Sequence, residues 1–336
     1  MVWRLGARAH AFVHGLFRPS EAELVRRQCA EVVRSFHDTG IASEDDRQLL
    51  IDAITGDISA RLGIEADGAG RDHIRAFTHA VFQYESLLCL PEVDWSRPRT
   101  IAELWGVREE LTRQRGFVAA FEDNRELLTL ALSAMLEPLY AACPALREPD
   151  GQTDGITVTT RLVDGIGDVG GVTQAMLGIA FAEDVEASGL LSRLRDRLER
   201  NTVAASGGNL ADPRFFARAP KLPKQFDAKS PEQLVSTYLG GTPLRALFDQ
   251  SLTFTIPTKA RFEHHHIIAG SGHGKTQTLQ YLIANDLGAV ADGKRSVIVL
   301  DSQGDLIRTI ADLKLFAPGE PLHDRVVIID PSDVEW

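Results

Sequence analysis

A short glycine-rich segment most constrains what this chain can fold into, because it stands between a strand-like run and a helix-like run. The segment consists of Ala269, Gly270, Ser271, Gly272, His273, Gly274, Lys275 and Thr276. It matches the P-loop pattern, with alanine in the first position. The apolar pair Ile267 and Ile268 precedes it, and apolar residues recur at helical spacing from Leu279 onwards. This order of strand, loop and helix predicts a nucleotide-binding site, the alternative being a glycine-rich turn without a ligand.

The residue types in this segment suit the binding of a nucleotide's phosphates. Glycines at 270, 272 and 274 allow a tight turn, so that successive backbone N–H groups and a helix N-terminus point at the anion. Lys275 is expected to bridge the β- and γ-phosphates, and the Thr276 hydroxyl is expected to bind Mg²⁺. Gln277, the next residue, completes the predicted binding loop. The predicted cofactors are therefore ATP and Mg²⁺.

Two further apolar runs follow the loop, and each ends in an aspartate. They are Ser296–Leu300 before Asp301 and Arg325–Ile329 before Asp330. Both predict buried parallel strands, which makes the expected fold an α/β P-loop NTPase core of the RecA-like type. The spacing from Lys275 to Asp301 fits one helix, one turn and one strand, so Asp301 is not interpreted as the Walker B aspartate.

The predicted core contains few strands and lacks an identifiable Walker B pair or catalytic glutamate. An open parallel sheet requires more strands and helices on both faces. We therefore expect the chain to be truncated relative to a complete ATPase. It should bind ATP better than it hydrolyses it, and no catalytic residue is assigned.

The region before the loop has a different pattern of apolar residues, and this pattern predicts two further segments. Residues 1–145 are expected to be α-helical, 146–232 to form a mixed α/β connecting region and linker, and 233–336 to form the partial P-loop core. The predicted elements are helices at Glu21–Asp38, Asp45–Leu62, Asp72–Leu88, Glu122–Ala142 and Ser188–Arg200, and a strand at Ile156–Val163. The arginines of the last helix are interpreted as a solvated face.

Charge and composition limit the partners of the chain. The net charge of -11 argues against a surface coated in basic residues, although it leaves room for local contacts with nucleic acid. No apolar run is long enough to span a bilayer, and three scattered cysteines fit a reducing compartment. The expected location is the cytoplasm, with no transmembrane segment.

Three weaker motifs have alternative interpretations. Gly165–Gly170 matches a dinucleotide fingerprint, but no second strand with a ribose-binding acid follows, so a turn is favoured. His264 and His266 could share a metal if they lie on one face of a strand, but no further ligand is nearby, so packing is favoured. Asp301–Gly304 fits the D-x-x-G of GTPases, yet no guanine-reading motif occurs in the chain.

The stretch from about Ser251 to Trp336 resembles the start of the HerA/FtsK-type DNA-translocating ATPases, and within them the conjugative coupling proteins of type IV secretion. The resemblance is carried by Arg261-Phe262-Glu263-His264, the A-G-S-G-H-G-K-T loop, V-I-V-L-D-S-Q-G-D-L and V-V-I-I-D-P-S-D-V. It implies that Lys275 and Thr276 bind phosphate and Mg²⁺. It also places Asp301 and Gly304 near the nucleotide, with Ser302 where the family has proline.

This resemblance also implies a function and partners. The expected function is the ATP-binding portion of an ATP-driven DNA translocase or a conjugative DNA-transfer ATPase. DNA, secretion or nuclease partner proteins, and self-association as a hexamer when complete are the implied partners. The alternative is a non-hydrolysing adaptor or remnant whose helical region binds a protein, and a GTPase is a minor alternative.

Overall fold

The computed structural model divides the chain into two compact units. The described residues are 19–64, 69–147, 155–209, 211–212, 219–268, 270, 272, 274–302 and 304–329. The helical unit, as we call it, takes the described residues of 1–151 and 159–253. The loop unit takes those of 152–158 and 254–336. The main division thus falls after residue 253, whereas the sequence placed segment boundaries after 145 and 232.

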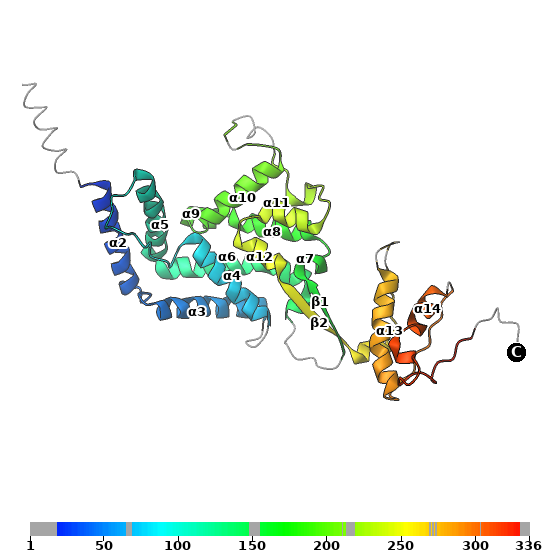
Figure 1. Ribbon diagram of the computed structural model, residues 1–336. Coiled ribbons are helices and arrows are strands. Elements are labelled where there is room, and N and C mark those ends of the chain that lie inside the picture. The colour runs from blue at the N-terminus through cyan, green and yellow to red at the C-terminus, as the bar shows by residue number, and fades with distance from the viewer. Residues whose placement is uncertain are drawn as a thin grey trace, which may run out of the picture. The chain divides into compact units, whose positions relative to one another are not determined.

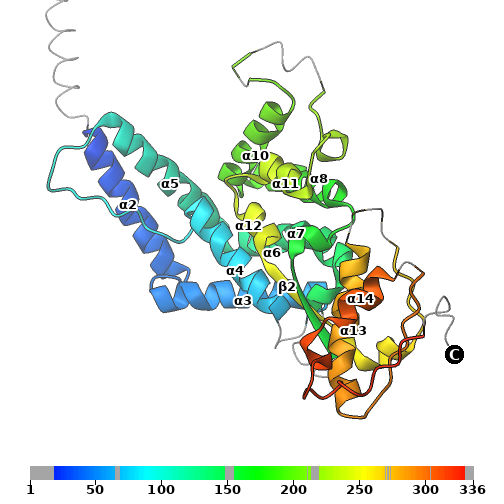
Figure 2. The ribbon, with the colours of Figure 1, turned by 45° about the vertical axis from the view of Figure 1, so that its right-hand side comes forward.

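The helical unit is built from antiparallel and crossing helices (Figure 1). These are α2 (Glu21–Asp38), α3 (Glu44–Leu62), α4 (Ala69–Glu85), α5 (Ile101–Ala119), α6 (Phe121–Ala142), α7 (Leu162–Gly165), α8 (Val169–Ala180), α9 (Glu183–Ser188), α10 (Ser192–Ala205), α11 (Pro231–Leu239) and α12 (Pro243–Asp249). Helix α2 packs against α5, and α6 packs against both α3 and α8 (Figures 1 and 2).

Helix α6 forms the centre of the helical unit. Leu128, Leu132, Met135 and Leu136 recur three and four residues apart along it, and each is fully buried. A buried side chain of this size contributes about 1.5–3 kcal/mol relative to an exposed one. The Tyr140 hydroxyl, near the end of this helix, donates to the Gly70 carbonyl oxygen at 2.8 Å, so this buried polar group is satisfied.

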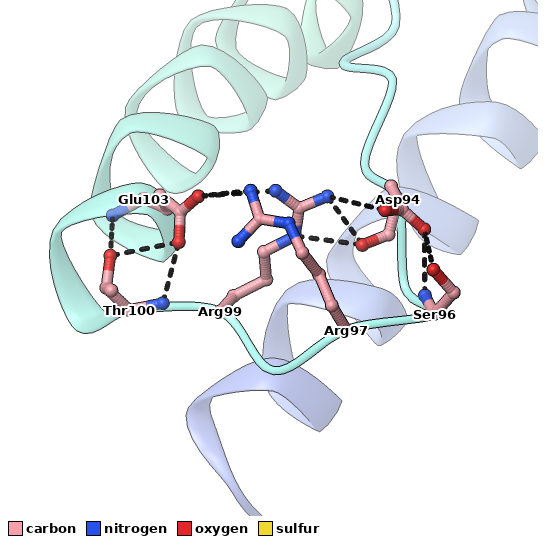
Figure 3. Close-up of polar contacts among 6 residues, drawn as sticks. All are labelled: Asp94, Ser96, Arg97, Arg99, Thr100 and Glu103. Carbon is pink, nitrogen blue, oxygen red and sulfur yellow. Dashed lines mark hydrogen bonds and ion pairs between the residues drawn. The ribbon is translucent and has the colours of Figure 1, made fainter.

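The start of α5 is fixed by polar contacts that the sequence encodes locally. Thr100 and Glu103 form a capping box, in which each side chain bonds the other residue's backbone N–H. The Glu103 carboxylate also accepts from Arg97 at 2.8 Å and from Arg99 at 3.3 Å (Figure 3). The hydrogen bond from the Thr100 backbone, followed by those from Arg97 and Thr100, lowers the pKa of Glu103 to about 2. Both arginines are thus engaged by acidic partners.

The described strands form a small antiparallel pair. Strand β1 (Gly155–Arg161) pairs with β2 (Ser251–Pro257) in a two-stranded sheet. The Thr159 and Thr253 hydroxyls lie 3.1 Å apart across this pair. Cross-strand threonine contacts of this kind stabilise a sheet by fractions of a kcal/mol.

The loop unit contains α13 (Lys275–Ala291) and α14 (Asp305–Ala311). Asp286 of α13, whose side chain is only 16% exposed, bonds Arg261 at 2.7 Å and Arg295 at 3.0 Å. The Arg295 guanidinium also lies 5.2 Å from the centre of the Phe262 ring. Arg261 and Phe262, which carry part of the family resemblance, therefore serve to position α13.

The prediction of a RecA-like parallel α/β core is wrong. Among the described residues, the segments predicted as buried strands, 261–268, 296–300 and 325–329, join no sheet. Ile298 is 88% exposed and Val327 is 84% exposed. Two of these segments, 296–300 and 325–329, line an apolar hollow of about 530 Å³ together with the two helices. β-Branched composition favours a strand only where neighbouring strands and covering layers bury it, and the described residues supply neither.

Several local predictions are confirmed. The predicted helix Glu21–Asp38 matches α2, and Asp45–Leu62 and Glu122–Ala142 match α3 and α6 to within a residue. The strand predicted at Ile156–Val163 is β1, although its last two residues belong to α7. Helix α5 lies within residues 1–145, which were expected to be α-helical, but it was not predicted as a separate helix. Its pattern is interrupted by the buried Gln114, which donates to the carbonyl oxygens of Ser86 and Cys89.

Candidate nucleotide-binding loop

The predicted phosphate-binding loop leads into α13 through glycines in the left-handed region. Gly272 has φ 77° and Gly274 has φ 76°, a conformation that side chains other than glycine adopt at a cost in strain. A Cβ added at either position would meet no atom within 4 Å. The glycines are therefore required by backbone conformation and not by crowding, and the space beside them is open.

Within the described part of the chain, no side chain occupies the backbone donors in the first turn of α13. Lys275, Thr276 and Gln277 have exposed side chains, and no side chain of the described residues caps this helix. The first N–H groups of a helix have no intrahelical partner. Together with the helix dipole, they create a partial positive charge at this end of α13. The adjacent Lys275 ammonium adds a full positive charge.

The first turn of α14 has the opposite arrangement. Gly304 precedes it at φ 75°, just as Gly274 precedes α13. There, however, the Asp301 carboxylate accepts from the backbone N–H of Leu306 at 2.9 Å and of Ile307 at 3.4 Å. Asp301 thus acts as the cap of α14. It was predicted as a residue near the nucleotide.

The structure brings most of the predicted loop residues into one stretch. Gly270, Gly272, Gly274, Lys275 and Thr276 lie together at the start of α13, followed by Gln277. The remaining predicted residues Ala269, Ser271 and His273 lie outside the described residues, as does Asp330 at the end of the last apolar run.

The weaker motifs of the sequence have structural explanations. Asp168 caps α8 by accepting from the Gly171 N–H at 2.7 Å. A protein carboxylate therefore takes the position that a pyrophosphate occupies in a dinucleotide site. Gly170 packs 3.5 Å from the Pro223 carbonyl oxygen, measured from an added Cβ. The Gly165–Gly170 match is thus a helix start that packs closely.

The histidines before the loop are exposed, which contradicts the favoured interpretation of packing within a strand. His264, His265 and His266 all lie at the surface in backbone without strand pairing. No group of three or more histidine, cysteine or acidic side chains suited to a metal occurs among the described residues. Thr276 therefore stays a predicted metal ligand, and it would bind a metal ion only together with bound phosphates.

The structure reveals one further polar site that the sequence did not predict. A groove in the helical unit is lined by Arg113 of α5 together with Arg193, Arg197 and Arg200 of α10. The i, i+4, i+7 spacing of the last three on one helix face was visible in the sequence. Their proximity to Arg113 was not visible there, because Arg113 and Arg193 are 80 positions apart along the chain.

Comparisons with models of known protein families, with curated proteins and with solved structures each found no match to this chain. Within the ranges that the structure describes, no helix combines the length and the apolar character needed to cross a bilayer. A functional assignment therefore rests on the chemistry of the chain's own residues.

Proposed function

We propose that residues 270–277 bind the phosphate groups of ATP together with Mg²⁺. The observation that carries this proposal is the first turn of α13, which is preceded by two left-handed glycines and capped by no described side chain. In the same unit α14 starts in the same way but has a carboxylate on its N–H groups. An uncapped helix start beside an exposed lysine suits an anion from solution.

Each residue of the loop has a distinct role in this proposal. The backbone N–H groups of the first turn hold the phosphate oxygens, while the Lys275 ammonium neutralises charge on the β- and γ-phosphates. The Thr276 hydroxyl would bind Mg²⁺, and the metal would supply positive charge that screens the phosphates. Gly272 and Gly274 keep the backbone close to the anion because neither carries a side chain.

The wider function proposed here follows from the resemblance of the loop and its flanking segments. We infer that the chain provides the ATP-binding portion of an ATP-driven DNA translocase or conjugative DNA-transfer ATPase. Hydrolysis requires a group that orients or activates water, and no residue of this chain is assigned to that task. The chain alone should therefore bind ATP with little turnover.

Titration with a fluorescent ATP analogue tests the proposal. Removing the Lys275 ammonium deletes a charge-assisted interaction, so Lys275→Ala should raise Kd by at least about tenfold. Lys314, whose side chain is 89% exposed in the same unit, provides the matched control. Lys314→Ala should leave Kd within about twofold of the parent value, as expected for a distant exposed charge.

The Thr276→Ala variant separates the two cofactors. It should weaken binding in Mg²⁺ more than in EDTA, since the hydroxyl acts through the metal. Equal Kd values for the parent chain and Lys275→Ala would contradict the assignment. Preference for GTP over ATP by tenfold or more would favour the GTPase alternative instead.

A further inference from the structure

Helix α5 exposes two large apolar side chains near its start. Ile101 is 64% exposed, and Trp105, one turn further on, is 60% exposed. Glu109, Thr112 and Gly116 continue the same line at the spacing of successive turns, and all three are exposed. We call these five residues the α5 stripe. Isoleucine and tryptophan usually bury most of their surface, so their place on one stripe suits a surface that another element covers.

The shape of the stripe suits a packed helix. An open hollow of about 390 Å³ runs along it. The hollow is lined by Trp105, Arg108, Glu109, Thr112 and Arg113. A Cβ added to Gly116 would meet no atom within 4 Å, so the described neighbours of this residue do not require a glycine. Since glycine weakens a helix interior, a further backbone that packs closely over α5 would explain its presence.

Helix α2 brings the preceding part of the chain to this stripe. Glu21, the first residue of α2, pairs with Arg108 at 3.0 Å, and Arg108 lies about one turn beyond Trp105. Further along, Glu31 pairs with Arg115 at 3.9 Å, so the two helices run side by side in the same direction (Figures 1 and 2). The segment before α2 therefore joins the described chain beside the stripe.

Helix α2 does not continue before Ser20. The Ser20 backbone is extended, and its hydroxyl accepts from the Glu23 N–H at 3.2 Å, which caps the helix. The chain that precedes Ser20 thus leaves the axis of α2. A change of direction at this residue allows that chain to pass over the neighbouring α5.

Residues 1–18 precede the described residues, and their sequence matches the stripe. Apolar residues recur three and four positions apart at Val2, Leu5, Ala9, Phe12 and Leu16. A helix of this length extends about 27 Å, and the stripe from Ile101 to Gly116 extends about 22 Å. The segment contains no acidic residue, and its lysine and arginine positions are Arg4, Arg8 and Arg18. The one charged residue of the α5 stripe is Glu109, which has the opposite sign.

We propose that residues 1–18 of this chain form a helix whose apolar face packs on the α5 stripe and covers Trp105. The pairing of Glu21 with Arg108 holds the end of this segment beside the stripe, so its effective concentration there is high. Burial of the indole and of Ile101 drives the packing. The proposal does not depend on nucleotide binding by the loop unit.

Tryptophan fluorescence tests this proposal in the full chain. Replacing Trp3, Trp95 and Trp336 by phenylalanine leaves Trp105 as the single tryptophan. Deletion of residues 1–18 from this variant should move its emission to longer wavelength and raise acrylamide quenching at least about twofold, because the indole gains contact with water. A synthetic peptide of residues 1–18 should reverse both changes saturably.

Single substitutions in the segment provide a matched pair. In a helix, Phe12 lies on the apolar face and His14 lies on nearly the opposite face. Phe12→Ser in the single-tryptophan chain should move the emission towards that of the deletion variant. His14→Ser should leave it unchanged.

Limited trypsin digestion tests the other side of the contact. Trp105→Ala removes the largest apolar group of the stripe, so cleavage after Arg8 should become at least about fivefold faster. Leu49, a 67% exposed apolar residue of α3, is the control, and Leu49→Ala should be cleaved at the parent rate. Both side chains are mostly exposed, so neither variant should unfold the helical unit, which circular dichroism checks.

Three results would overturn the proposal. The first is Trp105 emission that does not change when residues 1–18 are deleted from folded protein. The second is equal cleavage after Arg8 in Trp105→Ala and Leu49→Ala. The third is a Trp105 emission that depends on protein concentration, with dimers in sedimentation, because it would assign the stripe to a second copy of the chain.

Discussion

Two helices of the loop unit begin alike and differ in what meets their first turn. Both α13 and α14 follow a glycine near φ 75°. The Asp301 carboxylate closes the start of α14, whereas no described side chain closes the start of α13. On our proposal, a glycine before a helix marks a ligand site only where no described side chain occupies the N–H groups of the first turn. Predictions about capped and uncapped helix starts can test that distinction.

Another capped start lies in the helical unit, at α10, and its cap is buried. The buried Glu85 carboxylate accepts from the N–H of Leu194 at 2.7 Å and of Arg193 at 3.1 Å. Glu85→Ala leaves both donors without a partner, so we expect a loss of about 2–4 kcal/mol in the free energy of unfolding. Urea unfolding followed by circular dichroism measures this. A loss below about 0.5 kcal/mol would show that the cap is unimportant.

Glu85 also gives the helical unit a pH dependence. Burial, which outweighs the hydrogen bonds from Leu194 and Arg193, raises the pKa of Glu85 above its ordinary value of 4.5. A carboxyl whose folded pKa is raised favours the folded state while protonated, and this contribution is lost as pH rises through the folded pKa. Replacement by glutamine removes the titration.

The stability of Glu85→Gln relative to the parent should therefore increase as pH rises from 4.5 through the raised pKa. Denaturant unfolding at a series of pH values measures the difference. Glu199, an exposed glutamate of α10, is the control, and Glu199→Gln should track the parent. A parallel course for Glu85→Gln and the parent would contradict the prediction.

The cap of α14 should matter less, because it lies on a short surface helix. We expect Asp301→Ala to destabilise α14 by about 1 kcal/mol. Faster amide hydrogen exchange at Leu306 and Ile307 would report this change. Since Asp301 bonds to α14, ATP affinity should stay within about twofold. A tenfold rise in Kd would instead place Asp301 in the nucleotide site, as the sequence resemblance implied.

The smallest effect on stability comes from adding a negative charge to the uncapped start. Gln277→Glu places a carboxylate in the first turn of α13, where the helix dipole should stabilise it by about 0.3–1 kcal/mol. The same charge should repel phosphate and weaken ATP binding. A variant that is more stable than the parent but binds ATP more weakly is the result expected for an anion site. Tighter ATP binding by Gln277→Glu would argue against such a site.

The sequence predicted the parts of this fold that are encoded locally. The positions of α2, α3 and α6 followed from apolar periodicity and from acidic residues in the first turn, such as Asp45 of α3. The glycine loop was found for the same reason, since Gly272 and Gly274 act through their own backbone. The three apolar runs failed as predictors of a sheet because strand pairing depends on distant neighbours.

The groove between α5 and α10 illustrates a second limit of sequence analysis. Arg193 and Arg200 on α10 looked like an ordinary solvated face, which is the usual role of charges on one side of a helix. Only the fold shows that Arg113 of α5 lies beside them, in a groove that Glu109, Glu110 and Asp196 also line. Which charged residues from distant parts of the sequence lie beside one another cannot be read from any single segment.

Backbone amide NMR spectra recorded during a titration with ATP and Mg²⁺ test the central claim most directly. We predict saturable shifts of the N–H signals of Lys275, Thr276 and Gln277, with those of Leu306 and Ile307 unchanged. The Lys275→Ala variant should need at least about tenfold more ATP to reach the same shifts. Unchanged N–H signals across residues 270–277 at millimolar ATP, from well-folded protein, would contradict the claim.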